Sequence, residues 1–209
     1  MFTFSFDDGY QSWLRCADIL EEYGYRGVFN VCLRNVVRKR VPERRIMFPY
    51  RRVITWDEVH ELQRRGHQMG SHGVRHVDLD DCNWPEIHLE IIGSKQVFES
   101  RGVSVDTFAC PFNNYNERVK RVTLQHYGSV RGSPGFNQLP FKGSVYHAHN
   151  EGKQFPSGGI ILSNTLWNVG IWHDIAPAKF REAVEAVHTS DVKVLTVSEA
   201  IKTGEEPLK

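Results

Sequence analysis

Two adjacent carboxylates stand near the start of the chain, and two histidines spaced four residues apart follow later. Asp7 and Asp8 end the run Thr-Phe-Ser-Phe-Asp-Asp, and His72 and His76 enclose Gly-Val-Arg. Two carboxylates this close are both ionised at low cost only when a cation lies between them. One carboxylate and two imidazoles, with coordination positions left open, suit a hydrolytic zinc centre. The second carboxylate would then be available for acid–base chemistry on water.

Each motif alone has a plainer explanation. An Asp-Asp-Gly sequence is common in turns, and a pair of histidines can arise by chance in a chain that has 10 of them. We interpret His60 and His67 as helix-surface residues with no part in a metal site. The two motifs together are far more specific than either one.

Composition limits the class of protein. The chain has 209 residues, of which 40% are hydrophobic and 24% charged, and this predicts one globular domain over residues 1–209. The net charge of +1 gives no general attraction to nucleic acid or to membranes. No apolar run approaches the length that spans a bilayer. Asp7 and Asp8 fall where a signal peptide would be apolar, so we expect a cytoplasmic protein.

The cysteines are scattered without the spacing of a metal or disulfide motif, and we expect buried thiols in a reducing compartment. They are Cys16, Cys32, Cys82 and Cys110. Of these, Cys110 comes near the proposed site, where we interpret it as a packing residue.

Strand-like and helix-like segments alternate along the chain. Strands are expected over residues 2–6, 27–31, 68–71, 107–110, 128–131, 160–162, 170–172 and 192–197. Helices are expected over residues 11–23, 55–66, 83–99, 116–126 and 177–188, followed by a short helix capped by Ser198. This alternation predicts an α/β fold whose parallel sheet closes, or nearly closes, into a barrel. In such folds the loops at the carboxyl ends of the strands carry the chemistry.

Residues 34–52 interrupt this alternation and carry eight basic side chains against a single acid, Glu43. One interpretation is a solvated surface loop. The other is a clamp for a phosphate or carboxylate group of a substrate. Nucleic acid binding is not expected, because no aromatic interleaving or recognised module accompanies the charge.

Four further side chains have two interpretations each. His147 and His149 indicate either a second metal site or an exposed loop. Trp167 and Trp172 could stack on a sugar ring or belong to the core.

The motifs together resemble the polysaccharide deacetylase family, the NodB-homology domain of carbohydrate esterase family four. The resemblance rests on the runs from Thr3 to Gly9 and from Met69 to Leu79, with weaker matches at residues 108–112 and 171–174. It implies a distorted (β/α) barrel with about seven parallel strands. It also implies a carbohydrate substrate that loses an N-acetyl group, and one divalent metal ion, with zinc expected first and cobalt or nickel as alternatives.

The resemblance assigns roles by position. Asp8, His72 and His76 resemble the metal ligands, and Asp7 resembles the base that takes a proton from water. His173 resembles the acid that protonates the leaving amine. An amide needs both, because its carbonyl is a poor electrophile and its amine a poor leaving group.

Three further positions would contact the substrate. The backbone N–H of Phe112, after Pro111, resembles the donor to the developing oxyanion, and losing such a donor typically costs about 2.7–4 kcal/mol of barrier. Ile171 would line the pocket for the acetyl methyl group.

Two positions depart from the family pattern. Ala109 stands where the family commonly has an arginine that orients the catalytic aspartate. The fourth motif, an acidic residue with a tryptophan that tunes the catalytic histidine, is not evident. Arg131 lies in that region and Asp174 adjoins His173, but neither replaces the motif by position.

Two other functions stay open at this point. A relative that hydrolyses a small cyclic amide or imide is disfavoured by the intact metal set, because such relatives tend to lose it. A catalytically silent carbohydrate-binding relative is favoured by Ala109. The basic residues 34–52 fit a phosphate-bearing substrate, and the oligomeric state is left open.

Overall fold

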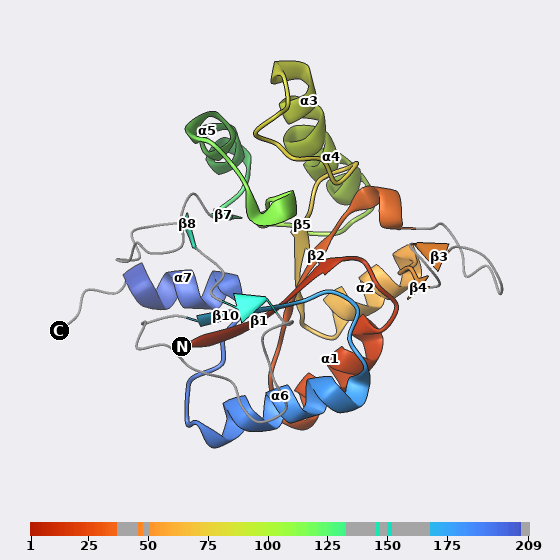
Figure 1. Ribbon diagram of the computed structural model, residues 1–209, viewed down its shortest axis with the longest axis vertical. Helices are drawn as coiled ribbons and strands as arrows, with labels where there is room; N and C mark the ends of the chain where they lie inside the picture. The colour runs from red at the N-terminus through yellow and green to blue at the C-terminus, as the bar shows by residue number, and fades with distance from the viewer. Residues whose placement is uncertain (37–45, 48–50, 133–144, 147–149, 152–167, 206–209) are drawn as a thin grey trace.

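A curled parallel sheet runs through the middle of the molecule (Figure 1). The computed structural model describes residues 1–36, 46–47, 51–132, 145–146, 150–151 and 168–205. The strand order is β8-β7-β6-β5-β2-β1-β10-β9, and every neighbouring pair is parallel. The strands are β1 (Phe2–Asp8), β2 (Val28–Val31), β5 (Gln68–Ser71), β6 (Thr107–Ala109), β7 (Ser129–Arg131), β8 (Val145–Tyr146), β9 (Asn150–Glu151) and β10 (Asn168–Trp172). A separate antiparallel pair consists of β3 (Ile46–Met47) and β4 (Arg51–Arg52).

Helices surround this sheet, so the predicted α/β fold with a distorted (β/α) barrel is confirmed (Figure 1). They are α1 (Trp13–Glu22), α2 (Trp56–Arg64), α3 (Trp84–His88), α4 (Ser94–Ser100), α5 (Glu117–His126), α6 (Pro177–Thr189) and α7 (Val197–Glu205). Short 3₁₀ turns occur at η1 (Leu33–Asn35) and η3 (Pro111–Asn113). Helices α1 and α6 pack against each other below the sheet in this view.

Strand β1 is the centre of the core. Its phenylalanines, Phe2, Phe4 and Phe6, are fully buried because alternate strand residues share one face and this face meets the helices. The ring of Phe4 lies 5.3 Å from that of Trp172 and 5.7 Å from that of Phe180. Trp172 is therefore a core residue, and of its two interpretations the sugar-stacking one is wrong.

The helix predicted over residues 83–99 contains an irregularity. It begins with a capping box between Asn83 and Glu86, as α2 does between Thr55 and Glu58. Between α3 and α4 the chain makes one π-helical turn, η2 (Leu89–Gly93). Such turns widen the helix by one residue and are frequent at functional sites.

The predicted strand over residues 192–197 is wrong, because only Val194 forms a bridge to β1. Helix α7 begins directly afterwards. Its cap is Thr196, whose hydroxyl accepts the N–H of Glu199 at 3.4 Å and whose own N–H donates to the Glu199 carboxylate at 2.8 Å. This capping box, rather than Ser198, ends the extended backbone.

Several expectations lie outside the described residues. They concern the strand at 160–162, His147, His149, Trp167 and most of the basic stretch 34–52. The four cysteines are buried free thiols, as predicted.

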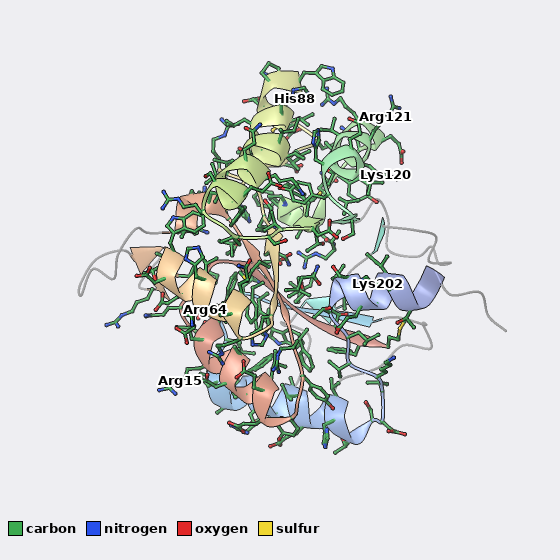
Figure 2. The ribbon with its side chains drawn as sticks, turned by 180° about the vertical axis from the view of Figure 1, so that it is seen from behind. Arg15, Arg64, His88, Lys120, Arg121 and Lys202 are labelled. Atoms are coloured by element: carbon green, nitrogen blue, oxygen red, sulfur yellow. The ribbon has the colours of Figure 1, made fainter. Side chains whose placement is uncertain are left out.

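Several basic side chains of the described part lie on helices α1, α2, α5 and α7. Figure 2 shows Arg15, Arg64, Lys120, Arg121 and Lys202 on helices around the periphery. Among the helices that the structure describes, none is long and apolar enough to cross a bilayer.

His67 is buried between α2 and β5, so its interpretation as a helix-surface residue is wrong. Its Nδ1 accepts the backbone N–H of Gly27 at 3.1 Å, and its Nε2 lies 2.9 Å from a carboxylate oxygen of Glu21. These contacts suit a neutral ring that carries its proton on Nε2. Burial lowers the pKa of His67 from 6.5 to about 4, although the Glu21 carboxylate acts in the opposite direction.

This burial predicts a pH-dependent stability. Between pH 6.5 and about 4 the unfolded chain binds a proton that folded His67 does not. The unfolding free energy should therefore fall as the pH decreases through this window, by about 3 kcal/mol. His67→Gln should remove this part of the pH dependence in urea unfolding curves. Parallel pH profiles for the variant and the unchanged protein would contradict it.

Candidate active site

The site lies where the central strands end. Asp8 is in register with Val31 on β2, and Val31 with Ser71 on β5. His72 follows Ser71 directly, so it lies at the same edge of the sheet as Asp8. The parallel sheet thus brings together residues that are far apart in the sequence.

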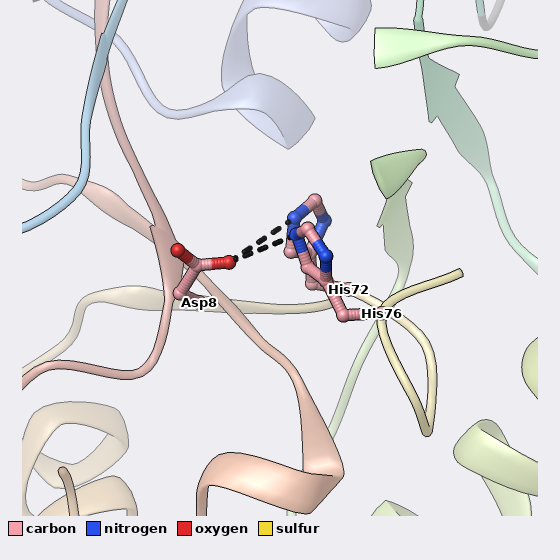
Figure 3. A group of neighbouring side chains, drawn as sticks. All are labelled: Asp8, His72 and His76. Carbon is pink, nitrogen blue, oxygen red and sulfur yellow. Dashed lines mark ion pairs between the residues drawn. The ribbon is translucent and has the colours of Figure 1, made fainter. Parts of the chain in front are cut away.

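Asp8, His72 and His76 converge (Figure 3). Oδ1 of Asp8 lies 3.1 Å from Nε2 of His76 and 3.6 Å from Nε2 of His72. One possible ligand atom from each residue lies within 4.8 Å of the other two. A tetrahedral zinc ion with bonds of about 2.0–2.1 Å separates its ligand atoms by about 3.4 Å. The group therefore needs only a small adjustment to hold such an ion.

Hydrogen bonding and burial of the group also suit a cation. Nδ1 of His72 donates to the backbone carbonyl of Ala109 at 2.7 Å, which leaves Nε2 as the ligand atom. Burial lowers the pKa of His72 despite the neighbouring carboxylates, and this favours the neutral, ligating ring. Oδ1 of Asp8 is buried and makes no well-aligned hydrogen bond within the described part of the chain. The donor set therefore fits a divalent metal.

Backbone strain is concentrated here. Of the described non-glycine residues, five have positive φ, and four of these are at the site: Asp8 (86°), His76 (58°), Phe112 (57°) and Asn113 (60°). Such conformations cost of order 1–3 kcal/mol each and persist when surrounding contacts hold them. The carbonyl of Asp8 accepts hydrogen bonds from the Cys32 N–H and the Asn35 side-chain amide, both at 3.1 Å. These bonds hold the turn at Asp8.

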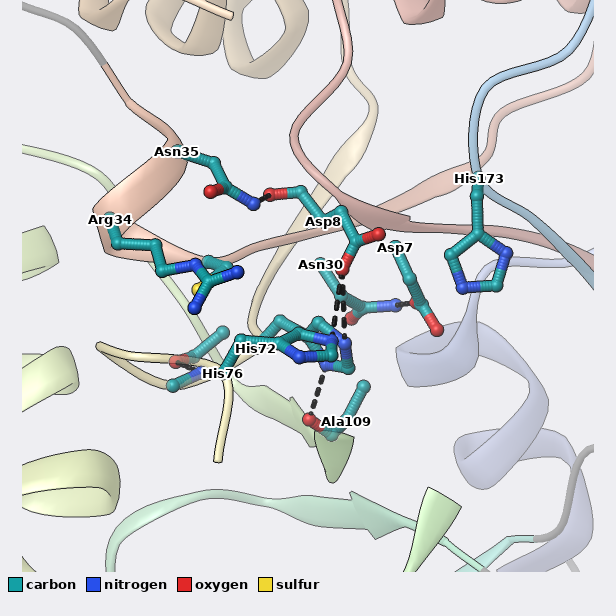
Figure 4. A network of polar contacts seen from close by, with 12 residues as sticks. Asp7, Asp8, Asn30, Arg34, Asn35, His72, His76, Ala109 and His173 are labelled. Carbon is teal, nitrogen blue, oxygen red and sulfur yellow. Dashed lines mark hydrogen bonds and ion pairs between the residues drawn. The ribbon is translucent and has the colours of Figure 1, made fainter. Parts of the chain in front are cut away.

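Asp7 has separate partners in the interior of the barrel, one of which, Asn30, is shown in Figure 4. One of its oxygens accepts from the Asn30 amide at 3.0 Å, and the other accepts from the Arg131 guanidinium. Arg131 also donates to the Ser5 hydroxyl at 2.9 Å. In the sheet, Ala109 is in register with Arg131 on the adjacent strand. The arginine contact that position 109 lacks is therefore supplied from β7, a role that the sequence alone did not assign to Arg131.

The two carboxylates stay ionised for different reasons. Burial alone would raise the pKa of Asp7, but the charge and hydrogen bond of Arg131, with help from His72, hold it well below its usual range. Burial likewise opposes ionisation of Asp8, and the neighbouring imidazoles of His76 and His72 lower its pKa. Both groups are thus anionic at neutral pH.

His173 follows β10 and lies on the other side of the aspartates from His72 and His76 (Figure 4). Its backbone carbonyl accepts the indole N–H of Trp13 at 3.2 Å. The neighbouring Asp174 accepts a hydrogen bond from Ser12 at 2.5 Å, just before α1. Asp174 therefore links β10 to α1.

The remaining predicted residues are placed as follows. Pro111 and Phe112 form a 3₁₀ turn after β6, and the Phe112 ring is 65% exposed and 4.8 Å from the His76 ring. Ile171 is buried in a small apolar cluster that includes Val197 of α7. The structure thus brings Phe112 to the metal-ligand group, whereas Ile171 contributes to the core, and its role in an acetyl pocket stays a prediction.

Sequence reasoning missed the residues that hold the two aspartates, above all Asn30, Asn35 and Arg131. A polar side chain inside an otherwise apolar strand could have marked Asn30, which lies between Phe29 and Val31 on β2. Their partners could not be named, because they lie on strands that are distant in sequence.

Comparisons with known proteins agree with this geometry. Residues 1–128 match the family model described as polysaccharide deacetylase. No curated protein matches the sequence.

Several solved structures are similar at low sequence identity. The Xyl-CE4 domain of a multidomain xylanase from the hindgut metagenome of Trinervitermes trinervoides has a TM-score of 0.65 at 18% identity, covering 97% of this chain and 90% of that one. A family 4 acetyl xylan esterase from Clostridium thermocellum, in complex with cobalt, has a TM-score of 0.67 at 13% identity, covering 99% and 92%. A CE4 family pseudoenzyme from Bacillus anthracis has a TM-score of 0.69 at 11% identity, covering 96% and 65%.

The buried pair between Asp7 and Arg131 yields a stability prediction. Arg131→Met leaves the Asp7 charge buried without its main partner, and we expect the unfolding free energy to fall by about 3–5 kcal/mol. The double variant Asp7→Asn/Arg131→Met removes the charge as well, so it should recover much of this loss in denaturant unfolding. A double variant less stable than Arg131→Met would contradict the assignment.

Proposed function

Because this chain belongs to the polysaccharide deacetylase family, we propose that it is a metal-dependent hydrolase that removes an N-acetyl group from a carbohydrate. The observation that carries the proposal is the convergence of Asp8, His72 and His76 within 4.8 Å, with the ionised Asp7 beside them. We propose that residues 1–209 act as one catalytic domain. The cytoplasmic location stays a prediction.

Asp8, His72 and His76 would hold the metal. A divalent ion in that position lowers the pKa of water toward about 7 and polarises a carbonyl oxygen. Asp7 accepts the proton of the attacking water, and Arg131 keeps its carboxylate ionised and fixed in direction. A carboxylate of such low pKa is a weak base, so its contribution depends chiefly on position.

His173 donates a proton to the leaving amine from the opposite side of the substrate. The backbone N–H of Phe112 donates to the developing oxyanion. Support for the first role is the place of His173 across from the metal-ligand histidines (Figure 4). Support for the second is the positive φ of Phe112, which holds the turn beside His76 in an uncommon conformation.

We propose zinc as the metal, with cobalt or nickel as substitutes, because the donors are two imidazoles and one carboxylate. For the substrate we propose an N-acetylated sugar that bears an anionic group such as phosphate. The basic residues of 34–52 support this by sequence, and Arg34 lies beside the metal-ligand loop (Figure 4).

A catalytically silent relative is the second candidate. Ala109 and the unmatched fourth motif favour it, and a similar fold occurs in a pseudoenzyme. The contact between Arg131 and Asp7 argues for the enzyme, because Arg131 supplies the guanidinium that is absent at position 109. Acetate release from N-acetylglucosamine oligomers and from a phosphate-bearing N-acetylated sugar, with added Zn²⁺ and with chelator, separates the two. Release that chelator does not affect would contradict metal dependence, and no release under any condition would favour the silent relative.

Asp7→Asn tests the base. The variant should bind one metal ion per chain, because Asp7 is not among the converging ligands. We expect its acetate release to fall by about 10²–10⁴-fold, the usual contribution of a general base. Metal content and acetate release are measured on the same sample. Activity near that of the unchanged protein would remove Asp7 from this role.

His72→Ala tests the ligand set. It removes one of three donors and leaves the Ala109 carbonyl without its partner. Both metal content and activity should be lost, while the thermal midpoint of the metal-free protein shows whether the chain is folded. A folded, fully metallated His72→Ala protein would refute the ligand assignment.

A further inference from the structure

We propose that Glu90 is a positioning residue that holds the metal-ligand loop, residues 72–76, in the conformation needed to bind the ion. This inference rests on the proposed metal site. Glu90 lies on the π-helical turn η2, whereas the two histidine ligands lie on the loop after β5. Its side chain reaches across to that loop.

The contacts of Glu90 involve both carboxylate oxygens. Oε2 accepts the backbone N–H groups of Val74 and Arg75, at 2.6 and 2.9 Å. Oε1 accepts Nε–H of Arg75 at 2.7 Å. Val74 and Arg75 lie between His72 and His76, so one carboxylate fixes the segment that joins the two imidazoles.

The burial of Glu90 means that its charge must be compensated by the groups around it. The side chain of Glu90 is only 1% exposed. A buried carboxylate is costly unless hydrogen bonds and an opposite charge compensate it. Within the part of the chain that the structure describes, the hydrogen bonds and the opposite charge come from the loop, in the manner of an anion bound by successive backbone N–H groups. The carboxylate and the loop therefore stabilise each other.

The loop depends on this anchor because its backbone is strained. His76 has a φ of 58° and Gly73 a φ of 79°. A Cβ on Gly73 would lie 2.8 Å from Oε2 of Glu90, so only glycine permits the close approach. The carbonyls of Gly73 and Val74 accept hydrogen bonds from the N–H groups of Leu33 and Arg34, at 3.0 and 2.9 Å. The segment after β2 thus donates hydrogen bonds to the carbonyls of the loop, and Glu90 on η2 accepts hydrogen bonds from its N–H groups.

The π turn has a role in this picture. It inserts one extra residue per turn between α3 and α4. Glu90, at its second position, is buried toward the loop, while Leu89 before it is largely exposed. The irregular turn therefore presents Glu90 on the side of the loop.

The test is the affinity of the whole chain for Zn²⁺, measured on metal-free protein by competition with a chromophoric chelator. Glu90→Gln keeps the shape of the side chain but places an amide donor among N–H groups. We expect the dissociation constant for Zn²⁺ to rise about 10–100-fold, as for other groups that orient metal ligands. Thermal midpoints of the metal-free proteins report folding separately.

Glu58→Gln is the matched control. Glu58 is also a buried glutamate, but it accepts from the N–H and hydroxyl of Thr55 at the start of α2, at 2.8 and 3.0 Å. Its substitution should lower the thermal midpoint and leave the Zn²⁺ dissociation constant within about twofold. If Glu90→Gln does not fold, Gly73→Ala perturbs the same contact from the loop and should also raise the dissociation constant.

The outcomes separate this inference from the proposed function. If the unchanged protein does not bind Zn²⁺, or binds it equally well as His72→Ala, the proposed metal site is wrong. If the unchanged protein binds Zn²⁺ through His72 but Glu90→Gln, or Gly73→Ala in its place, binds equally well, Glu90 is only a structural residue. A lower thermal midpoint with an unchanged dissociation constant leads to the same conclusion.

Discussion

The turn of the backbone at Asp8 separates two neighbouring carboxylates, and the rest of the site depends on it. Asp7 follows the alternation of β1 and faces the barrel interior with Ser5, whereas the positive φ of Asp8 directs its side chain to the histidines. Two carboxylates this close cannot share one environment and both stay ionised cheaply. Each therefore has its own compensation: Arg131 for Asp7, and imidazoles with room for a cation for Asp8.

Support for this turn comes from strands on both sides of β1. The hydrogen bonds from Cys32 and Asn35 hold the carbonyl of Asp8, and the Asn30 amide holds Asp7. The loop after β5 has a comparable set of contacts from Glu90 and from the segment after β2. Strained ligand positions are tolerated because such contacts over-determine them, and the same contacts keep the donors in place before an ion binds.

Arg131 shows why a comparison of motifs by position can mislead. A guanidinium acts where its donors lie, and the side chains of paired residues on adjacent parallel strands share one face. Arg131, which pairs with Ala109 in the sheet, therefore makes the contact with Asp7 although the motif at position 109 has no arginine. The arginine is absent from the motif in the sequence, but its guanidinium is present at the site.

Local pattern and spacing were enough for most of the strands and helices, the caps at Thr55 and Asn83, and the expectation that a carboxylate and two imidazoles meet at one edge of the sheet. These follow from periodicity and from the rule that parallel strands end at one edge. Only the tertiary structure decided the partners of Asp7, the anchor of the metal-ligand loop and the burial of His67. These contacts join residues on separate elements, and residue type and spacing along one chain do not specify which distant backbone groups will meet a buried charge.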